Sequence, residues 1–289
     1  FNILCTAMLL PAGNLLEKLA IRLVPDAKRR EETSELDARL LATPALALGQ
    51  ARNVAGEMAA CAVRALENAL TSLTGYTPEL ARSIREDEER CDHYEDIIGT
   101  YLVQLSSHSL SDSESQESTE LLKTIGDFER ISDHAVNVLE SAEELQSKGL
   151  SFSPAAMAEY ETLARAIREI LHLSLDSFRQ NDAARAARVE PLEQVIDKLK
   201  EEMRTRHILR MRQGQCSIEA GFVWADLLTD LERTSDHCSN IAGCVIDARA
   251  HNLNLHETLR QAKTADGSFQ QTYESYVEKY QLPVPSSNV

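Results

Sequence analysis

The sequence has little of what β-structure and long loops require. Its 289 residues include only 11 glycines, 8 prolines and 5% aromatic residues, and strand-like runs of Val, Ile and aromatic residues are nearly absent. Ala, Leu, Glu and Arg dominate instead, and these residues favour helices. A hydrophobic content of 43% is enough for real cores. The composition therefore predicts an all-α protein.

Positive charge is also scarce, because 30 Lys and Arg stand against 46 Asp and Glu, for a net charge of −16. No basic stripe with interleaved aromatic residues is present, which argues against nucleic acid as a partner and favours cations. The six cysteines show no C-x-x-C spacing, so we do not expect a Cys zinc site. We expect instead that the protein occupies a reducing compartment. No phosphate-binding loop or nucleophile motif occurs, so we expect no enzyme.

One phrase of twelve residues occurs twice in the chain. Residues 127–138 read DFERISDHAVNV, and residues 230–241, about a hundred positions later, read DLERTSDHCSNI. Seven polar residues recur in the same order, which is a strong internal repeat. Residues four apart lie on one face of a helix, so each phrase presents two carboxylates side by side. These pairs are Glu129 with Asp133 and Glu232 with Asp236.

A second Glu-x-x-x-Asp pair precedes each phrase. These upstream pairs are Glu88 with Asp92 and Glu193 with Asp197. If the helices that carry them are antiparallel neighbours, four carboxylates converge in each half, on a spot that suits hard or borderline cations. Buried carboxylate pairs need a compensating cation, either an arginine of the phrase or a metal ion. An exposed acidic face without any ligand is the alternative.

Capping signals divide the chain into two sets of three long helices. An N-cap residue followed by proline marks helix starts, and glycine marks helix ends. The starts are Thr43-Pro44, Thr77-Pro78 and Ser153-Pro154, and the ends are Gly75, Gly149 and Gly214. The Ser-rich stretch 109–117 predicts a turn. We therefore expect two tandem antiparallel three-helix bundles, with a short extra helix at the N-terminus.

The predicted segments follow from this punctuation. Residues 1–24 are apolar at helical spacing, yet the apolar run is too short to span a bilayer alone, which takes about 20 residues. We interpret them as the end of a membrane helix, with an amphipathic helix as the alternative. The basic residues 28–30 then place the later segments on the cytoplasmic side. These segments are a linker at 25–43, bundles at 44–149 and 152–251, and a tail at 252–289 with one short helix.

With the two phrases, their upstream pairs and the helix order together, the chain resembles the PhoU family of phosphate-signalling proteins over residues 40–250. Its N-terminal segment resembles the closing helix of a sodium/phosphate cotransporter family protein. The resemblance implies that the four carboxylate pairs bind metal ions, with iron foremost and zinc, manganese or magnesium as alternatives. It also implies control of phosphate transport at the cytoplasmic face of the inner membrane. The implied partners are a membrane transport domain, of the same or an associated protein, and a second copy of the chain.

Two other classes compete with this interpretation. A ferritin-like di-metal oxidase needs Glu-x-x-His on two helices, and only Glu169 with His172 fits that spacing. A metal-free helical adaptor would pair its carboxylates with arginines such as Arg130. We expect the histidine of each phrase, His134 and His237, to form hydrogen bonds within the bundle, because it points about 100° away from the second carboxylate.

Overall fold

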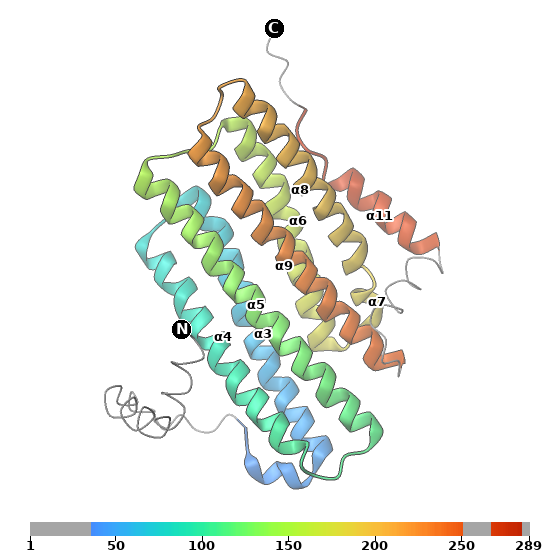
Figure 1. Cartoon of the computed structure of the whole chain (residues 1–289). Coiled ribbons are helices and arrows are strands. Elements are labelled where there is room, and N and C mark those ends of the chain that lie inside the picture. Colours follow the sequence, from blue (N-terminus) through green and yellow to red (C-terminus); the bar gives the residue numbers. More distant parts are fainter. Residues whose placement is uncertain (1–35, 251–266, 285–289) are drawn as a thin grey trace, which may run out of the picture. The chain divides into compact units, whose positions relative to one another are not determined.

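The computed structural model describes residues 36–250 and 267–284, and every regular element in these two ranges is a helix (Figure 1). The all-α prediction is confirmed. The predicted helix at residues 1–24 and most of the linker lie outside the described residues. The elements are η2 (Ala38–Ala42), α3 (Pro44–Gly75), α4 (Pro78–Leu105), α5 (Asp112–Lys148), α6 (Pro154–Gln180), α7 (Ala183–Ala186), α8 (Val189–Arg212), α9 (Ile218–Ala250) and α11 (Gly267–Lys279).

Most helix ends follow the capping residues that the sequence indicates. The Thr77 hydroxyl accepts a hydrogen bond from the backbone N–H of Leu80 at 3.1 Å and so caps α4. Helix α5 ends at Gly149, whose φ of 61° lies in the left-handed region that glycine adopts without strain. Ser153 caps α6 in the same way as Thr77 caps α4.

Three details differ from the prediction. Thr43 makes no side-chain cap at the start of α3, and its backbone N–H donates to the Leu40 carbonyl at the end of the short 3-10 helix η2. The end of the predicted linker is therefore ordered. The predicted turn at 109–117 is shorter than expected, since Ser111 and Glu114 form a capping box that starts α5 at Asp112.

Helices α3, α4 and α5 form one antiparallel set, and α6, α8 and α9 form a second, with α5 and α9 side by side at the join (Figure 1). One apolar face of α6 is buried throughout, and it consists of Leu163, Ile167, Ile170, Leu171, Leu175 and Phe178. Phe128 of α5 and Phe178 of α6 meet edge to face, with ring centroids 5.3 Å apart. Truncating Phe128 to alanine would cost about 3–5 kcal/mol. The two sets thus share one core.

The predicted short helix of the tail is α11, and it packs on α8. Tyr276 and Tyr280 are buried in this contact, and the Lys279 ammonium lies 2.6 Å from a Glu169 carboxylate oxygen on α6. No helix within 36–250 or 267–284 is both long enough and apolar enough to cross a membrane.

Candidate metal site

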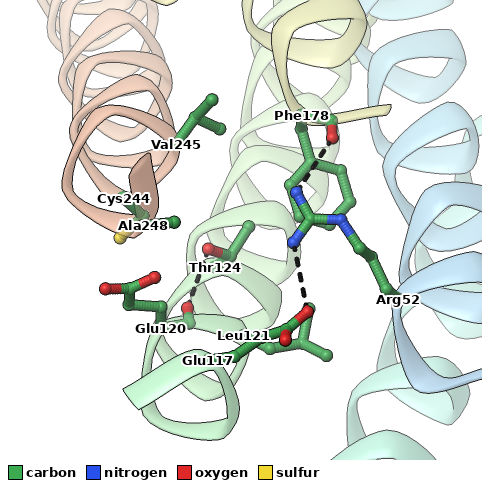
Figure 2. Close-up of a pocket in the computed structure, with 9 residues that line it drawn as sticks. All are labelled: Arg52, Glu117, Glu120, Leu121, Thr124, Phe178, Cys244, Val245 and Ala248. Carbon is green, nitrogen blue, oxygen red and sulfur yellow. Dashed lines mark hydrogen bonds and ion pairs between the residues drawn. The ribbon is translucent and has the colours of Figure 1, made fainter. Parts of the chain in front are cut away.

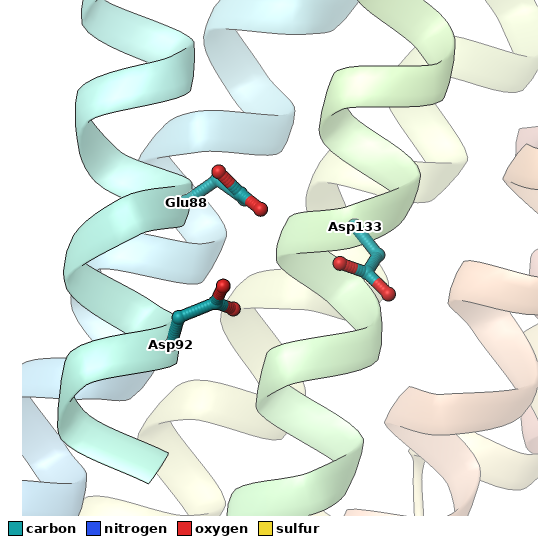
Figure 3. A group of neighbouring side chains, drawn as sticks. All are labelled: Glu88, Asp92 and Asp133. Carbon is teal, nitrogen blue, oxygen red and sulfur yellow. The ribbon is translucent and has the colours of Figure 1, made fainter. Parts of the chain in front are cut away.

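In the first half, three of the four predicted carboxylates come together. Glu88 and Asp92 lie one turn apart on α4, and Asp133 faces them from α5 (Figure 3). One carboxylate oxygen of each residue lies within 4.8 Å of the other two. Oxygen ligands on opposite sides of a hard cation are separated by about twice the metal–oxygen distance of 2.0–2.6 Å. The three oxygens therefore fit around one cation with small side-chain rotations.

The electrostatics of this cluster favour a cation. Burial and the carboxylate of Asp133 raise the pKa of both Glu88 and Asp92. The fourth predicted residue, Glu129, stands one turn before Asp133 on α5. Burial first, and then the negative charge of Asp133, raise the pKa of Glu129 to about 7, although Arg130 opposes the shift. Without a bound cation, Glu88, Asp92 and Glu129 therefore retain a proton more readily than free carboxylates.

Arg130 is a partial counter-charge for the first-half cluster. Its guanidinium lies 3.2 Å from an Asp133 oxygen and 3.4 Å from a Glu129 oxygen, and its side chain is 61% exposed. An exposed ion pair of this kind contributes about 0–1 kcal/mol. Arg130 thus approaches the carboxylates from solvent and leaves the side that faces α4 to a different cation.

The equivalent carboxylates of the second half do not converge in this way within the described residues. Glu193 and Asp197 lie on α8, and Glu232 and Asp236 lie on α9. The ammonium of Lys200 on α8 is 3.0 Å from a Glu232 oxygen. Burial, Glu232 and Asp197 raise the pKa of Asp236, whereas His237 and Lys200 lower it. The second half therefore already contains a cation of its own.

Lys200 was not singled out by the sequence patterns, because it lies outside the repeated phrase. It stands three residues after Asp197, and the residue three after Asp92 in the first half is Glu95. Glu95 raises the pKa of Glu129, so it adds negative charge to the first-half cluster. The two halves thus carry opposite charges at one equivalent position. Aligning the upstream pairs and extending the comparison by one helical turn would have found the difference.

The remaining polar residues of the phrase join the two halves. An Asp230 oxygen lies 3.0 Å from His134 Nδ1 and accepts a hydrogen bond from Asn137 at 3.2 Å. An Asp127 oxygen makes the same contacts with the second phrase. It lies 2.8 Å from His237 Nδ1 and 3.2 Å from Asn240 Nδ2.

The two histidine rings face each other across this junction, with centroids 5.6 Å apart. The prediction that both histidines form hydrogen bonds in the bundle is confirmed. The role of Asp127 and Asp230 as acceptors between the halves was missed, because each aspartate pairs with the other copy of the phrase.

Hollows among the described residues lie beside Glu129 and beside Arg52. The larger, of about 440 Å³, borders the first-half cluster and is lined by Glu95, Lys123, Gly126, Asp127, Glu129, Arg130, Asn240 and Cys244. The smaller lies beside Arg52, whose guanidinium donates to the Phe178 carbonyl at 3.3 Å and pairs with Glu117 at 3.8 Å (Figure 2). This second hollow measures only about 10 Å³, which holds about one water molecule. A third hollow, of about 160 Å³, is also lined by Arg52 and Glu117. Of these three, the 440 Å³ hollow is the one that reaches Glu129, and Glu88, Asp92 and Asp133 do not line it.

The ferritin-like alternative finds no support in the one sequence match. Glu169 contacts Lys279 and Tyr280, and His172 Nε2 lies 2.8 Å from a Glu67 oxygen. Glu169 and His172 therefore each interact with other residues, not with one another. Of the cysteines that the structure describes, Cys61, Cys91, Cys238 and Cys244 are buried thiols and Cys216 is half-buried.

Comparison with known proteins adds a family match. The model of the PhoU domain matches residues 55–142 and 160–245. The Thermotoga maritima protein named phosphate-specific transport system accessory protein PhoU homolog 1 is 26% identical over 196 residues, which are 68% of this chain and 83% of the relative. The Pseudomonas putida protein named phosphate-specific transport system accessory protein PhoU homolog is 28% identical over 184 residues, which are 63% of this chain and 70% of the relative.

Two solved structures share the fold. PhoU from Pseudomonas aeruginosa superposes with a TM-score of 0.59 at 24% identity, over 74% of this chain and 97% of the other. The phosphate transport system regulatory protein PhoU from Streptococcus pneumoniae gives a TM-score of 0.64 at 18% identity, over 73% and 98%. Helix α11 lies beyond the segments that the domain model matches.

Proposed function

The chain belongs to the PhoU family, and we propose that it is a regulatory, non-catalytic domain that controls phosphate transport and holds a metal ion in its first half. The observation that carries the proposal is the convergence of Glu88, Asp92 and Asp133 from two helices. The names of the relatives, accessory proteins of a phosphate-specific transport system, support the link to phosphate transport.

The metal would be held by the three converging carboxylates, with Glu129 as the next available ligand. An all-oxygen set suits hard or borderline divalent cations, and iron, manganese, magnesium and zinc are the candidates. When bound, the ion would offset most of the negative charge of the cluster and offer a coordination position to an anion such as phosphate. The protein's own part is to link α4 to α5 through this site, with the half-buried Glu129 beside it.

The proposed partner is a membrane transport domain, in the same or an associated protein, and a sodium/phosphate cotransporter is the specific candidate. The proposed location is the cytoplasmic face of the inner membrane. Support for the partner comes from the names of the relatives, and support for this location comes from the apolar and basic N-terminal residues. Residues 1–35, on which the proposed location rests, lie outside the described residues.

A metal-free adaptor is the second candidate, and one observation favours it. Lys200 and Arg130 already form ion pairs with phrase carboxylates, at 3.0 Å and 3.2 Å. A chelator separates the two candidates, because ion pairs survive chelation whereas a metal-linked α4–α5 contact loses stability. An unfolding temperature that is unchanged by chelation, in protein purified with iron or manganese, would support the adaptor.

The functional test is phosphate uptake in cells that lack their own copy of this protein. We expect the wild-type chain to restore controlled uptake, Asp133→Asn to lose that control, and the matched variant Asp236→Asn to retain it. Equal behaviour of the two variants would contradict the first-half site. Uptake that is the same with and without the chain would contradict the regulatory role altogether.

A further inference from the structure

The tip of the hairpin formed by α8 and α9 carries an unusual amount of exposed apolar surface. Ile208 and Leu209 in the last turn of α8 are 45% and 49% exposed, and Ile218 and Phe222 in the first turns of α9 are 71% and 68% exposed. Ile218 and Phe222 are one helical turn apart and so share a face of α9. Four large apolar side chains within 15 residues form an exposed cluster rather than isolated residues.

The same tip is basic in an acidic chain. Residues 203–218 contain four arginines and neither Asp nor Glu, although the whole chain has a net charge of −16, and Glu219 follows directly, between Ile218 and Phe222. Three of these arginines form ion pairs, since Arg206 and Arg210 pair with Glu159 at 3.4 Å and 2.8 Å, and Arg204 lies 3.9 Å from Glu201. Arg204 and Arg212 flank Ile208 by one turn on either side and are exposed. The apolar cluster therefore lies between two outward-facing cations.

The corresponding tip of the first half has the opposite character. Residues 106–120, which connect α4 to α5 and start α5, contain four acidic residues and neither Lys nor Arg. The two hairpin tips lie at opposite ends of the helix array in Figure 1. One end of the array thus presents apolar and basic residues, and the other presents acidic residues.

We propose that the α8–α9 tip binds the surface of an anionic phospholipid bilayer, with Ile218 and Phe222 entering the interface and Arg204 and Arg212 contacting lipid phosphates. Apolar side chains beside arginines are the combination that such interfaces bind. The apolar residues sit at the end of a hairpin, so they project outward, and a bilayer accepts projecting side chains without a matching groove. The charge also fits, because the cytoplasmic leaflet is negative and attracts the exposed arginines of the tip.

This contact goes beyond the proposed metal-dependent role and does not depend on it. It would hold the domain in one orientation against the membrane, with the α8–α9 tip toward lipid and the acidic α4–α5 tip away. The carboxylate cluster lies mid-way along α4 and α5, so bilayer contact at the α8–α9 tip leaves it accessible.

The test is hydrogen–deuterium exchange of the full 289-residue chain with vesicles of phosphatidylcholine alone or mixed with phosphatidylglycerol. We expect protection of residues 208–222 with the mixed vesicles only, weakened by added salt. Ile218→Ser with Phe222→Ser should abolish this local protection and weaken tip-dependent binding at least about tenfold. Arg212→Glu should weaken it less, by about fivefold.

The matched control is Leu46→Ser with Val103→Ser, which removes two side chains that are 59% and 63% exposed elsewhere in the chain. This control should leave the protection of residues 208–222 unchanged. Local exchange is the readout because residues 1–24 can themselves bind vesicles without involving the tip. No protection of 208–222 with the mixed vesicles would overturn the proposal. Protection that appears only with an acidic protein partner, or that survives the tip variant, would overturn it too.

Discussion

The two halves of this chain have the same order of long helices and the same four carboxylate positions, yet they arrange these carboxylates differently. In the first half, Glu88, Asp92 and Asp133 bring oxygens within 4.8 Å of one another. In the second half, Lys200 pairs with Glu232 at 3.0 Å and is only 18% exposed. A repeated carboxylate motif therefore does not imply two equal sites. Lys200, one turn after Asp197, makes the net charge around the second-half carboxylates less negative.

The halves differ far less in how they hold each other. Asp127 and Asp230 accept the same pair of hydrogen bonds, each from the other copy of the phrase, at 2.8–3.2 Å. The first Asp, the His and the Asn of each phrase thus make the same contacts in both copies. The Glu and the second Asp of each phrase have different surroundings in the two copies. Matched substitutions in the two halves separate these two uses.

The largest expected difference lies in metal affinity. Asp133→Asn should weaken binding of manganese or iron about 100-fold or more, because it removes a charged ligand that bridges from α5 to α4. Asp236→Asn, the same change at the equivalent position of the second half, should leave affinity within about threefold. Isothermal titration of metal-free protein measures both. Equal losses would remove the proposed asymmetry.

The packing use of the phrase should be equal in the two halves. Asp127→Ala and Asp230→Ala should each lower the free energy of unfolding by about 2 kcal/mol, because each leaves a histidine and an asparagine without their acceptor. Urea denaturation followed by circular dichroism gives both values. A difference above about 1 kcal/mol between the two losses would show that the two sets of hydrogen bonds stabilise the fold unequally, although their distances are similar.

Exchanging the charges that distinguish the halves should shift the metal site. Lys200→Glu should create a second binding event and raise second-half affinity about tenfold, because it removes an internal cation and adds a carboxylate. Lys200→Gln, which removes the cation alone, should give a smaller gain. Metal-to-protein stoichiometry by elemental analysis is the measurement, and an unchanged stoichiometry in Lys200→Glu would argue that backbone geometry, not charge, sets the difference.

The smallest expected effect is a pH dependence of metal-free protein. The pKa of Glu129 is raised to about 7 in the folded chain, above its ordinary value of 4.5. The folded state therefore binds the Glu129 proton more tightly than the unfolded state does. The stabilisation that results is fully present below about pH 4.5 and is lost as the pH rises through 7. The raised pKa values of Glu88 and Asp92 act in the same direction.

We expect the unfolding temperature of metal-free protein to fall by about 2–4 °C between pH 5 and pH 8. Glu129→Gln should flatten this slope, whereas Glu232→Gln should change it little, because Lys200 already stabilises the Glu232 charge. Saturating metal should also flatten the slope in the wild type. A decrease of the unfolding temperature with pH that is steeper with metal than without it would contradict this explanation of the pH dependence.

Local signals in the sequence predicted most of the fold. Prolines after Thr77 and Ser153, and the glycine at 149, set helix ends through backbone geometry that acts within a few residues. Helix α7 and η2 were not predicted, because each is about one turn long and has no apolar period to detect.

The candidate site was predictable in its residues, and its asymmetry was predictable only in part. The spacing of Glu88 and Asp92 follows from helix geometry alone. An alignment of the two halves shows Lys200 at the position of Glu95, but the ion pair between Lys200 and Glu232 depends on how α8 packs against α9. The contact of Asp127 with His237 likewise depends on how the two halves join, and tertiary packing decides such contacts.

The most direct test of the asymmetry is anomalous X-ray diffraction from crystals soaked in manganese. We predict an anomalous peak among Glu88, Asp92 and Asp133, and none among Glu193, Asp197 and Asp236, at a concentration that saturates binding in solution. Peaks of equal height in both halves, or a peak in the second half alone, would contradict the claim that Lys200 confines metal binding to the first half.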